Sequence, residues 1–319
     1  METRLSRRRA LAVIAGLGAA AAMSGANAAR EPLLEWRGTA LGADATLVFA
    51  AADQVRAEEA IAASLAEVER LERIFSLHLA RSEICHLNEH GVLRHPSLDM
   101  RNLLLQARAL HRATEGLFDP TVQVIWDRIR SGIDADRTRE GRVPSHLVER
   151  IGFEHVEIDS DRIALPAGVS ITLNGIAQGY ITDRVADVLR QRGWRNVLID
   201  LGETRALAGN SFDVAIGGGS TRLALRDAAL ASSSAAPLPV GSTGLVSHVF
   251  DPRTGTPAST RWATVSVRHA SATIADALST ALLLTDTGKA GAAGRIVSRF
   301  PGTTAWFTAP GRADVVVGN

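Results

Sequence analysis

The sequence has few of the residues that usually carry a strong chemical signal. Its 319 residues include one cysteine, Cys85, so an intrachain disulfide and a cysteine-rich metal module are both excluded. It has one tyrosine, Tyr180, and one lysine, Lys289, against 34 arginines. Such an arginine bias has two explanations, a GC-rich genome and a need for bidentate phosphate contacts, and the sequence leaves both open.

The chain also lacks an excess of charge of either sign. Lysine and arginine together number 35 and aspartate and glutamate 34, which gives a formal net charge of +1. Nucleic acid and anionic membrane surfaces select for clustered positive charge, so neither is expected as the main partner. The hydrophobic content of 46% and charged content of 22% are ordinary for a globular protein and exclude disorder, collagen and a coiled coil.

The first 28 residues have the three parts of an export signal. The paired arginines of S-R-R-R-A-L precede an apolar run, Ala12 to Met23, and the small residues A-N-A end the segment at Ala28. Arginine pairs of this kind are typical of a twin-arginine signal. The apolar run is short for a membrane span, although an uncleaved N-terminal anchor is an alternative. We therefore expect residues 1–28 to be a twin-arginine signal and residues 29–319 a single periplasmic domain.

The rest of the chain mixes helical and strand periodicities without strict alternation, which predicts an α+β fold rather than a doubly wound sheet. The expected helices are Gln54 to Phe75, Arg101 to Glu115, Gly179 to Gly193 and Thr273 to Leu284, with a loop and short helix in residues 134–149. The expected strands are a hairpin from Leu33 to Phe49, His155 to Leu165, Val169 to Leu173, Asn196 to Leu201, several within residues 211–250, Trp262 to His269, and Thr304 to Val317.

Two segments combine a glycine with a turn. In G-L-F-D-P-T-V, Pro120 forces Asp119 into an extended conformation that exposes its carboxylate, although a simple helix stop explains the same residues. In T-L-N-G-I-A-Q-G-Y-I-T-D-R, a strand leads through a glycine-flanked turn into a helix whose N–H groups can receive phosphate oxygens. A plain tight turn is the alternative. Tyr180, which follows this turn, can either stack on an aromatic ligand or fill core space.

Two later segments offer a possible base and a set of oxygen ligands. In S-H-V-F-D-P-R-T-G, His248 is either a general base or a histidine at the end of a strand. In A-D-A-L-S-T-A-L, Asp276 and Thr280 are four residues apart on a predicted helix, so their oxygens point the same way. Carboxylate and hydroxyl oxygens suit Mg²⁺ rather than zinc, while an ordinary acidic residue on a core helix is the alternative.

These four segments in this order, together with Ser82-Glu83-Ile84 and Leu87-Asn88, resemble the ApbE family of FAD:protein FMN transferases. The similarity runs from about Gly38 to Leu284. The signal and the N-G-I-A-Q-G-Y form are most similar to the NosX-like members, which serve nitrous oxide respiration. The resemblance implies an α+β fold with a single mixed-sheet domain of the ApbE/T-fold-like type.

The resemblance also implies a reaction. The protein would bind FAD, split its pyrophosphate with the help of Mg²⁺, and transfer FMN to a Thr or Ser hydroxyl of a partner protein, releasing AMP. The partner would be a membrane-bound, NosR-like respiratory flavoprotein. His248 and Asp276 are the implied catalytic residues, with His248 acting as the base for the acceptor hydroxyl or as an orienting group.

Further positions follow from the same resemblance. The implied metal ligands are Ala177 through its carbonyl, Asp276 and Thr280 through their side chains, and Ser279 at a position that can be acidic in relatives. The implied FAD-binding residues are Leu41, His78, Leu117, Phe118, Asp119, Asn174, Tyr180 and Phe250.

The sequence departs from the family pattern at two charged positions. Many relatives read D-L-G-G-I-A-K-G-Y, and Thr172 and Gln178 replace the acid and the lysine here. Lys289 lies beyond the last motif, so Arg253 is the expected substitute cation. Gln178 and Ser279 favour an alternative function, a non-catalytic periplasmic carrier of FAD. A metal-binding accessory protein is a third hypothesis, suggested by Cys85, His86 and His90, but relatives have no metal site in that segment.

Overall fold

The computed structural model describes residues 13–14, 33–40, 43–50, 53–131, 143–217, 219–235, 237–239, 245–285 and 291–318. The expected export signal, apart from Val13–Ile14, therefore lies outside the described residues, as do Leu41 and Lys289. Within the described ranges, no helix is both long enough and apolar enough to span a membrane.

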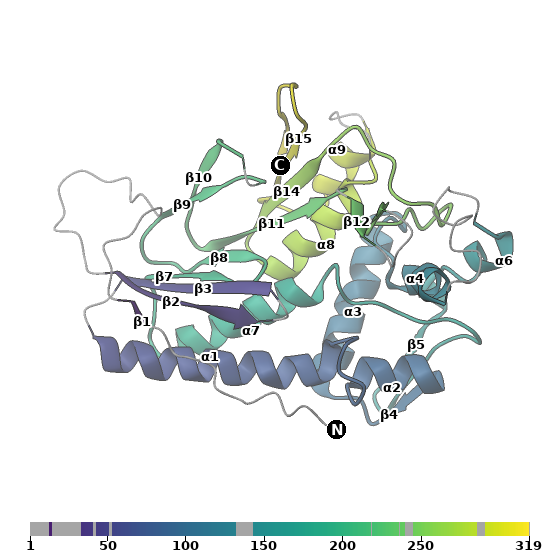
Figure 1. The fold of residues 1–319 in the computed structure, drawn as a ribbon, viewed down its shortest axis with the longest axis horizontal. Coiled ribbons are helices and arrows are strands. Elements are labelled where there is room, and N and C mark those ends of the chain that lie inside the picture. The colour runs from purple at the N-terminus through teal and green to yellow at the C-terminus, as the bar shows by residue number, and fades with distance from the viewer. Residues whose placement is uncertain are drawn as a thin grey trace.

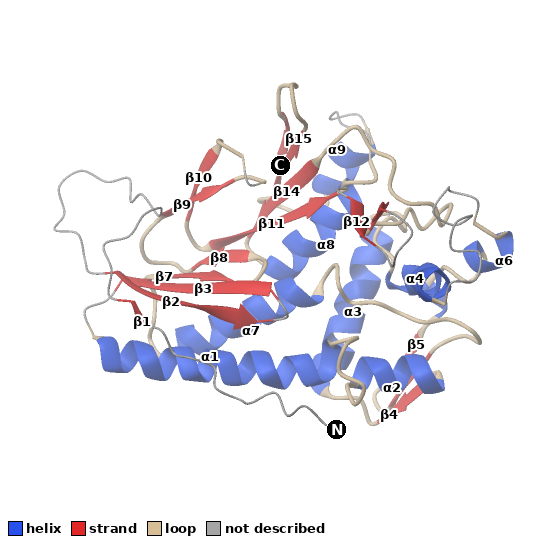
Figure 2. Cartoon of the chain, in the orientation of Figure 1, coloured by secondary structure: helices blue, strands red, loops and turns tan. Residues whose placement is uncertain are grey.

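A nine-stranded sheet forms the centre of the described structure, and each pair of neighbouring strands in it runs antiparallel (Figures 1 and 2). In spatial order its strands are β1 (Val13–Ile14), β2 (Leu33–Ala40), β3 (Ala43–Ala50), β7 (Val197–Asp200), β8 (Thr204–Ala206), β11 (Ala228–Ser234), β14 (Thr264–His269), β15 (Thr304–Thr308) and β16 (Val315–Gly318). The α+β class and the β2–β3 hairpin are thus confirmed.

Three helices cover one face of this sheet: α1 (Gln54–Phe75), α7 (Ala177–Gln191) and α8 (Ala272–Leu282). The bounds of α1 are those predicted, because its apolar residues recur at the helical period and Asp53 caps its start, accepting a hydrogen bond from the Arg56 N–H (3.0 Å). The apolar sides of the helices and the sheet meet in one large core that includes the fully buried Leu47, Leu71 and Leu278.

Helices α7 and α8 hold each other by reciprocal capping. The Asp183 carboxylate on α7 accepts hydrogen bonds from the first backbone N–H groups of α8, those of Ala272 and Thr273 (2.9 and 3.0 Å). In return, the Asp276 carboxylate on α8 accepts one from the Gly179 N–H in the first turn of α7 (3.0 Å). Because the first N–H groups of a helix have no partner inside it, each helix satisfies the other.

The opposite face of the sheet is covered by a hairpin of β9 (Phe212–Ala215) and β10 (Arg222–Leu225), which encloses a second apolar cluster with β8 and β11. The remaining elements lie beside the helical layer (Figure 1). They are α2 (Glu83–His90), β4 (Val92–Arg94), α3 (Leu98–Ala113), η1 (Pro120–Val122), α4 (Gln123–Arg130), α6 (Ser145–Val148), η2 (Phe153–His155), β5 (Glu157–Ile158), β6 (Arg162–Ala164), β12 (Pro237–Pro239), β13 (Leu245–Ser247) and α9 (Ala292–Val297).

The predicted strand Val169 to Leu173 is not a strand in the structure. Its backbone is satisfied by a side chain instead, because the Asn88 amide accepts a hydrogen bond from the Ile171 N–H (2.8 Å) and donates one to the Ile171 carbonyl (2.9 Å). The apolar run is still buried, which is why it had the appearance of a strand. The helices α2, α4 and α9 were not expected, since each is short and has few apolar repeats.

We expect Asp183→Ala to destabilise the fold by about 3 kcal/mol, since it removes several hydrogen bonds from α8 and leaves the buried Arg205 guanidinium without its carboxylate. The measurement is the free energy of unfolding in urea. Asp187→Ala is the matched control, because this aspartate lies one turn further along α7 and is 41% exposed. Equal stability of the two variants would show that the capping carboxylate contributes little.

Candidate functional site

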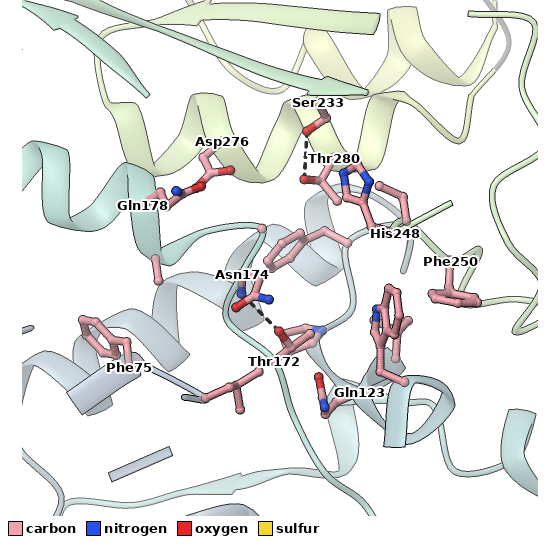
Figure 3. Close-up of a pocket in the computed structure, with 18 of the residues that line it drawn as sticks. Phe75, Gln123, Thr172, Asn174, Gln178, Ser233, His248, Phe250, Asp276 and Thr280 are labelled. Carbon is pink, nitrogen blue, oxygen red and sulfur yellow. Dashed lines mark hydrogen bonds between the residues drawn. The ribbon is translucent and has the colours of Figure 1, made fainter. Parts of the chain in front are cut away.

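A cavity of about 860 Å³ is lined by side chains of α4, α7 and α8, among other segments (Figure 3). Its wall comes from segments far apart in the chain: the loop after α1, the turn before η1, the turn before α7, one end of β11, and the segment after β13. Four of the sequence motifs therefore converge on one space. The lining residues used below are His78, Leu117, Phe118, Asp119, Gln123, Trp126, Arg130, Thr172, Asn174, Gly175, Ala177, Gln178, Glu203, Ser233, His248, Phe250, Asp276 and Thr280.

One end of the cavity is acidic. Burial raises the pKa of the Asp276 carboxyl to about 7, against which the hydrogen bond from the Gly179 N–H acts. Burial also raises the pKa of Glu203 well above its ordinary range, and the nearby negative charge of Asp276 raises it further. Figure 3 shows the Gln178 amide pointing toward Asp276. A neutral amide cannot offset the charge of a carboxylate, so this end of the cavity favours a cation.

Hydroxyl groups lie next to these carboxylates. The Ser233 Oγ lies 3.2 Å from the Thr280 Oγ1 and 2.6 Å from the Ser279 Oγ. Gly175 faces the same group, because a Cβ built on it would come within 3.1 Å of the Thr280 Oγ1. A larger residue at Gly175 would therefore crowd the hydroxyl, so the turn approaches α8 as closely as a glycine allows.

The other end of the cavity is aromatic. The rings of Trp126 and Phe250 meet edge to face, with centroids 5.2 Å apart. His248 lies between this end and Thr280, as Figure 3 shows. Its Nδ1 atom is buried and has no hydrogen-bond partner among the described residues, which is unusual for a polar atom in the interior.

Asp119 forms part of the cavity wall, but its carboxylate is held by hydrogen bonds within the protein. Its carboxylate accepts hydrogen bonds from the Thr121 N–H (2.8 Å) and from the Phe153 N–H (3.1 Å). Burial raises the pKa of the Asp119 carboxyl, and these hydrogen bonds oppose the rise. The sequence prediction that Pro120 keeps Asp119 extended is confirmed, with φ −140° and ψ 111°. The prediction that this conformation exposes the carboxylate is wrong, because the Asp119 side chain is only 2% exposed and its carboxylate is hydrogen-bonded within the protein.

The structure brings most of the predicted site residues together and leaves two of them out of the cavity wall. Those that line the cavity are His78, Leu117, Phe118, Asp119, Asn174, Ala177, His248, Phe250, Asp276 and Thr280. Tyr180 instead donates a hydrogen bond from its hydroxyl to Asp99 (2.8 Å) and packs its ring against Phe75. Ser279 is fully buried behind Thr280, where its hydroxyl donates to the Asp276 carbonyl. Leu41 lies outside the described residues.

The cationic side chain at the cavity is not the expected Arg253. Arg253 does not line the cavity, because it is 58% exposed and its guanidinium pairs with Asp251 at 2.6 Å. Among the residues that the structure describes, Arg130 supplies the guanidinium of the wall. Gln123, Trp126 and Ser233 also line the cavity but were not predicted, since no recognised motif includes them. Glu203 was not predicted as a site residue either, although the resemblance to the family extends to Gly202-Glu203-Thr204-Arg205.

The donor set of the acidic end fits Mg²⁺. Asp276 and Thr280 present a carboxylate and a hydroxyl, which are hard oxygen ligands, and the carboxylate is 4% exposed without a cationic side chain bonded to it in the described structure. A second group, His111, Asp119 and Glu154, also places its ligand atoms within 4.8 Å of one another. There, however, the two carboxylates face opposite nitrogens of the imidazole, at 3.3 and 3.1 Å, and the Nδ1 atom also contacts the Phe118 carbonyl oxygen at 3.1 Å, so the three side chains do not converge on one ion.

The residues behind the metal-accessory hypothesis do not converge. The Cys85 Sγ points to the Ser76 carbonyl at 3.6 Å, whereas the His86 and His90 rings stack on each other with centroids 4.2 Å apart. None of these three residues lines the cavity. The Ser82 to Asn88 segment has a different role, because Ser82 caps α2 and Asn88 holds the segment around Ile171.

Comparison with known proteins agrees with this arrangement. The model of the ApbE family matches residues 41–301. The FAD:protein FMN transferase of Haemophilus influenzae is 28% identical over 235 residues, which cover 66% of this chain and 67% of that protein. The enzyme of the same name from Treponema pallidum is 25% identical over 274 residues, covering 76% and 75%.

Two solved structures share the fold. The ApbE protein of Thermotoga maritima superimposes with a TM-score of 0.73 at 24% identity, covering 89% of this chain and 97% of that one. The apo form of the Pseudomonas stutzeri flavinyl transferase ApbE gives 0.72 at 23% identity, with coverage of 89% and 94%. The fold thus places the chain in the structural class of the ApbE proteins. Because the family model spans most of its length, the protein belongs to the ApbE family.

The acidic end of the cavity predicts a pH dependence in metal-free protein. The Asp276 carboxyl keeps its proton up to about pH 7 in the folded state but only to about pH 4 when unfolded, so stability declines as the pH rises from about 4 to about 7. Asp276→Asn removes this titration. We expect the variant to gain roughly 2–4 kcal/mol of stability over the wild type between pH 4.5 and 8, measured by urea unfolding with a chelator present. The exposed Asp159→Asn is the control, and an Asp276→Asn curve parallel to the wild type would contradict the assignment.

Proposed function

We propose that the protein is an FAD:protein FMN transferase, which moves FMN from FAD to a Thr or Ser hydroxyl of a partner protein and releases AMP. The observation that carries the proposal is the convergence of four motif segments on a single cavity with an acidic end and an aromatic end. FAD has a pyrophosphate between two flat rings. The pyrophosphate matches the acidic end, where a metal ion would bind, and a ring matches the aromatic end. The relatives named above bear the same activity in their names.

The residues at the acidic end would hold the metal ion. Asp276 and Thr280 would ligate Mg²⁺, with Ala177 contributing its carbonyl and Ser279 supporting Thr280 through Ser233. When bound, Mg²⁺ would offset the negative charge of the pyrophosphate. The burial of Asp276 strengthens its attraction for a cation, since water screens the charge poorly there.

His248 would act on the acceptor. Its imidazole lies at the cavity wall next to Thr280. This position suits a general base that takes the proton of the incoming Thr or Ser hydroxyl, or a group that orients that hydroxyl. The remaining wall residues, Leu117, Phe118, Asn174 and Phe250 among them, would bind the substrate.

The location and the partner are part of the proposal. Residues 1–28 would export the protein through the twin-arginine pathway, so that residues 29–319 form one periplasmic domain, with an uncleaved anchor as the alternative. The acceptor would then be a membrane-bound respiratory flavoprotein with a periplasmic Thr or Ser site. The similarity of the signal and of the N-G-I-A-Q-G-Y segment to NosX-like proteins supports a NosR-like partner.

A non-catalytic FAD carrier is the second candidate. It is favoured by Gln178, which stands where many relatives have a lysine and leaves the buried carboxylates with a neutral neighbour. A carrier would bind FAD in the same cavity without breaking its pyrophosphate. Only the fate of the bound FAD separates the two functions.

Incubation of the purified protein with FAD, Mg²⁺ and an acceptor domain should produce a fluorescent protein band and a mass gain equal to FMN. Asp276→Ala should abolish the transfer and weaken Mg²⁺-dependent FAD binding, and His248→Ala should slow transfer by about 10²- to 10⁴-fold. Cys85→Ser is the control and should transfer normally.

Each outcome discriminates between the hypotheses. FAD binding by the wild type without transfer to any acceptor would favour the carrier and refute the transferase. A clear loss of transfer in Cys85→Ser would revive the metal-accessory hypothesis. Full activity of Asp276→Ala would remove this carboxylate from the metal site.

A further inference from the structure

Helix α4 presents three side chains to the cavity that no sequence motif includes. Gln123, Trp126 and Arg130 are three and four residues apart, so they lie along one face of the helix. The other face of α4 carries Val124, Ile125 and Ile129, which form a small core with Leu147 and Phe250, and the Trp126 ring packs against the edge of that core. The helix is therefore anchored on one side and displays an amide, an indole and a guanidinium on the other.

These three groups suit one kind of ligand. An indole offers a flat surface for stacking, an amide can pair with the ring nitrogens and exocyclic groups of a heterocycle, and a guanidinium binds phosphate. Gln123 is only 2% exposed, and burying a primary amide is costly unless its polar atoms find partners. Figure 3 shows the Gln123 amide with its oxygen on the side of Thr172, which is another residue of the cavity wall.

A single carboxylate fixes two of these side chains. The Asp127 Oδ1 accepts hydrogen bonds from the Gln123 Nε2 (2.8 Å) and from the Arg130 Nη2 (2.9 Å). Its Oδ2 accepts one from the Ser170 hydroxyl (2.5 Å), in the segment that leads to the N-G-I-A-Q-G turn. Asp127 thus sets the amide and the guanidinium relative to each other and ties α4 to the segment that precedes this turn.

We propose that the cavity face of α4 is a subsite for a flat nitrogen heterocycle that carries a phosphate, and that Asp127 is its positioning residue. The proposal rests on the proposed function, because FAD carries two such rings, isoalloxazine and adenine, on either side of its pyrophosphate. The Trp126 ring stacks on the heterocycle, the Gln123 amide pairs with its edge, and Arg130 binds a phosphate oxygen. Asp127 contacts none of these ligand atoms and acts through Gln123 and Arg130.

A purely structural role for Asp127 would give a different result from a positioning role. The Asp127 side chain is 47% exposed, and exposed ion pairs within a helix contribute little to stability. Asp187 on α7 has the same arrangement, since it pairs with Arg184 and Arg190 three residues away on either side and is 41% exposed. Asp187 does not line the cavity, so Asp187→Ala is a matched control.

The experiment measures the Kd of FAD by flavin fluorescence, and the thermal midpoint, for the wild type, Asp127→Ala, Asp127→Asn and Asp187→Ala. Asp127→Ala should bind FAD about tenfold more weakly, as expected for the loss of two charge-assisted hydrogen bonds that position ligand-binding groups. Asp127→Asn should recover part of this loss, because its amide oxygen can still accept a hydrogen bond. Asp187→Ala should bind FAD like the wild type, and the thermal midpoints report any loss of stability separately from the loss of binding.

Separate titrations with FMN and with AMP identify the ring. Weaker binding of AMP alone by Asp127→Ala assigns the subsite to adenine, and weaker binding of FMN alone assigns it to isoalloxazine. Trp126→Ala should show the same preference. The proposal is overturned if Asp127→Ala and Asp127→Asn bind FAD, FMN and AMP as tightly as Asp187→Ala does.

The two proposals can fail independently. A wild type that binds FAD but transfers no FMN refutes the transferase, while the ring preference of Asp127→Ala still establishes the subsite. Conversely, normal transfer together with unchanged nucleotide binding in both Asp127 variants refutes the subsite and leaves the transferase intact.

Discussion

The close antiparallel crossing of α7 and α8 is the contact on which the candidate site depends. A Cβ at Gly179 would lie 2.3 Å from the Ala272 carbonyl and 2.8 Å from the Asp276 Cβ, so the two helices approach more closely than any residue other than glycine permits. This proximity lets each helix cap the other through Asp183 and Asp276. One contact therefore fixes the relative position of the glycine turn and of the carboxylate that faces the cavity.

The buried carboxylates at the acidic end of the cavity carry a free-energy penalty. Asp276 and Glu203 are both more than nine-tenths buried, and the Gln178 side chain that lines the same cavity is neutral. Taking two carboxylates out of water without a cationic partner is unfavourable, and the raised pKa values express that penalty. A bound cation would therefore stabilise these two carboxylates. A fold selected for stability alone would be expected to place an arginine next to them.

Much of the fold follows from local signals, and the rest does not. The apolar period and the Asp53 cap specify α1, and the alternation between Leu33 and Phe49 specifies a hairpin. Val169 to Leu173 looked like a strand because apolar composition reports burial and not the partner of the backbone, which here is the Asn88 side chain.

The site was predictable where a motif carried it and hidden elsewhere. Asp276, Thr280 and His248 stand in recognisable segments, and all three reach the cavity. Tyr180 is in such a segment too, but the helix turns it toward Asp99, and a motif does not tell which side of a helix faces the ligand. Trp126 and Ser233 lie outside every motif, and they reach the cavity because of contacts between distant parts of the chain.

The two hydrogen bonds between the Asn88 amide and Ile171 make this part of the molecule less tolerant of mutation than the central sheet. A strand is held by a ladder of bonds that any sequence can make, because the donors and acceptors belong to the backbone. The segment before the glycine turn is instead held at Ile171 by the two ends of one primary amide, a pair of groups that glutamine alone among the other side chains carries, on a longer stem. A substitution at position 88 would therefore weaken the hold on this cavity wall, which then depends on the bonds of Thr172 to Pro120 and of Ser170 to Asp127.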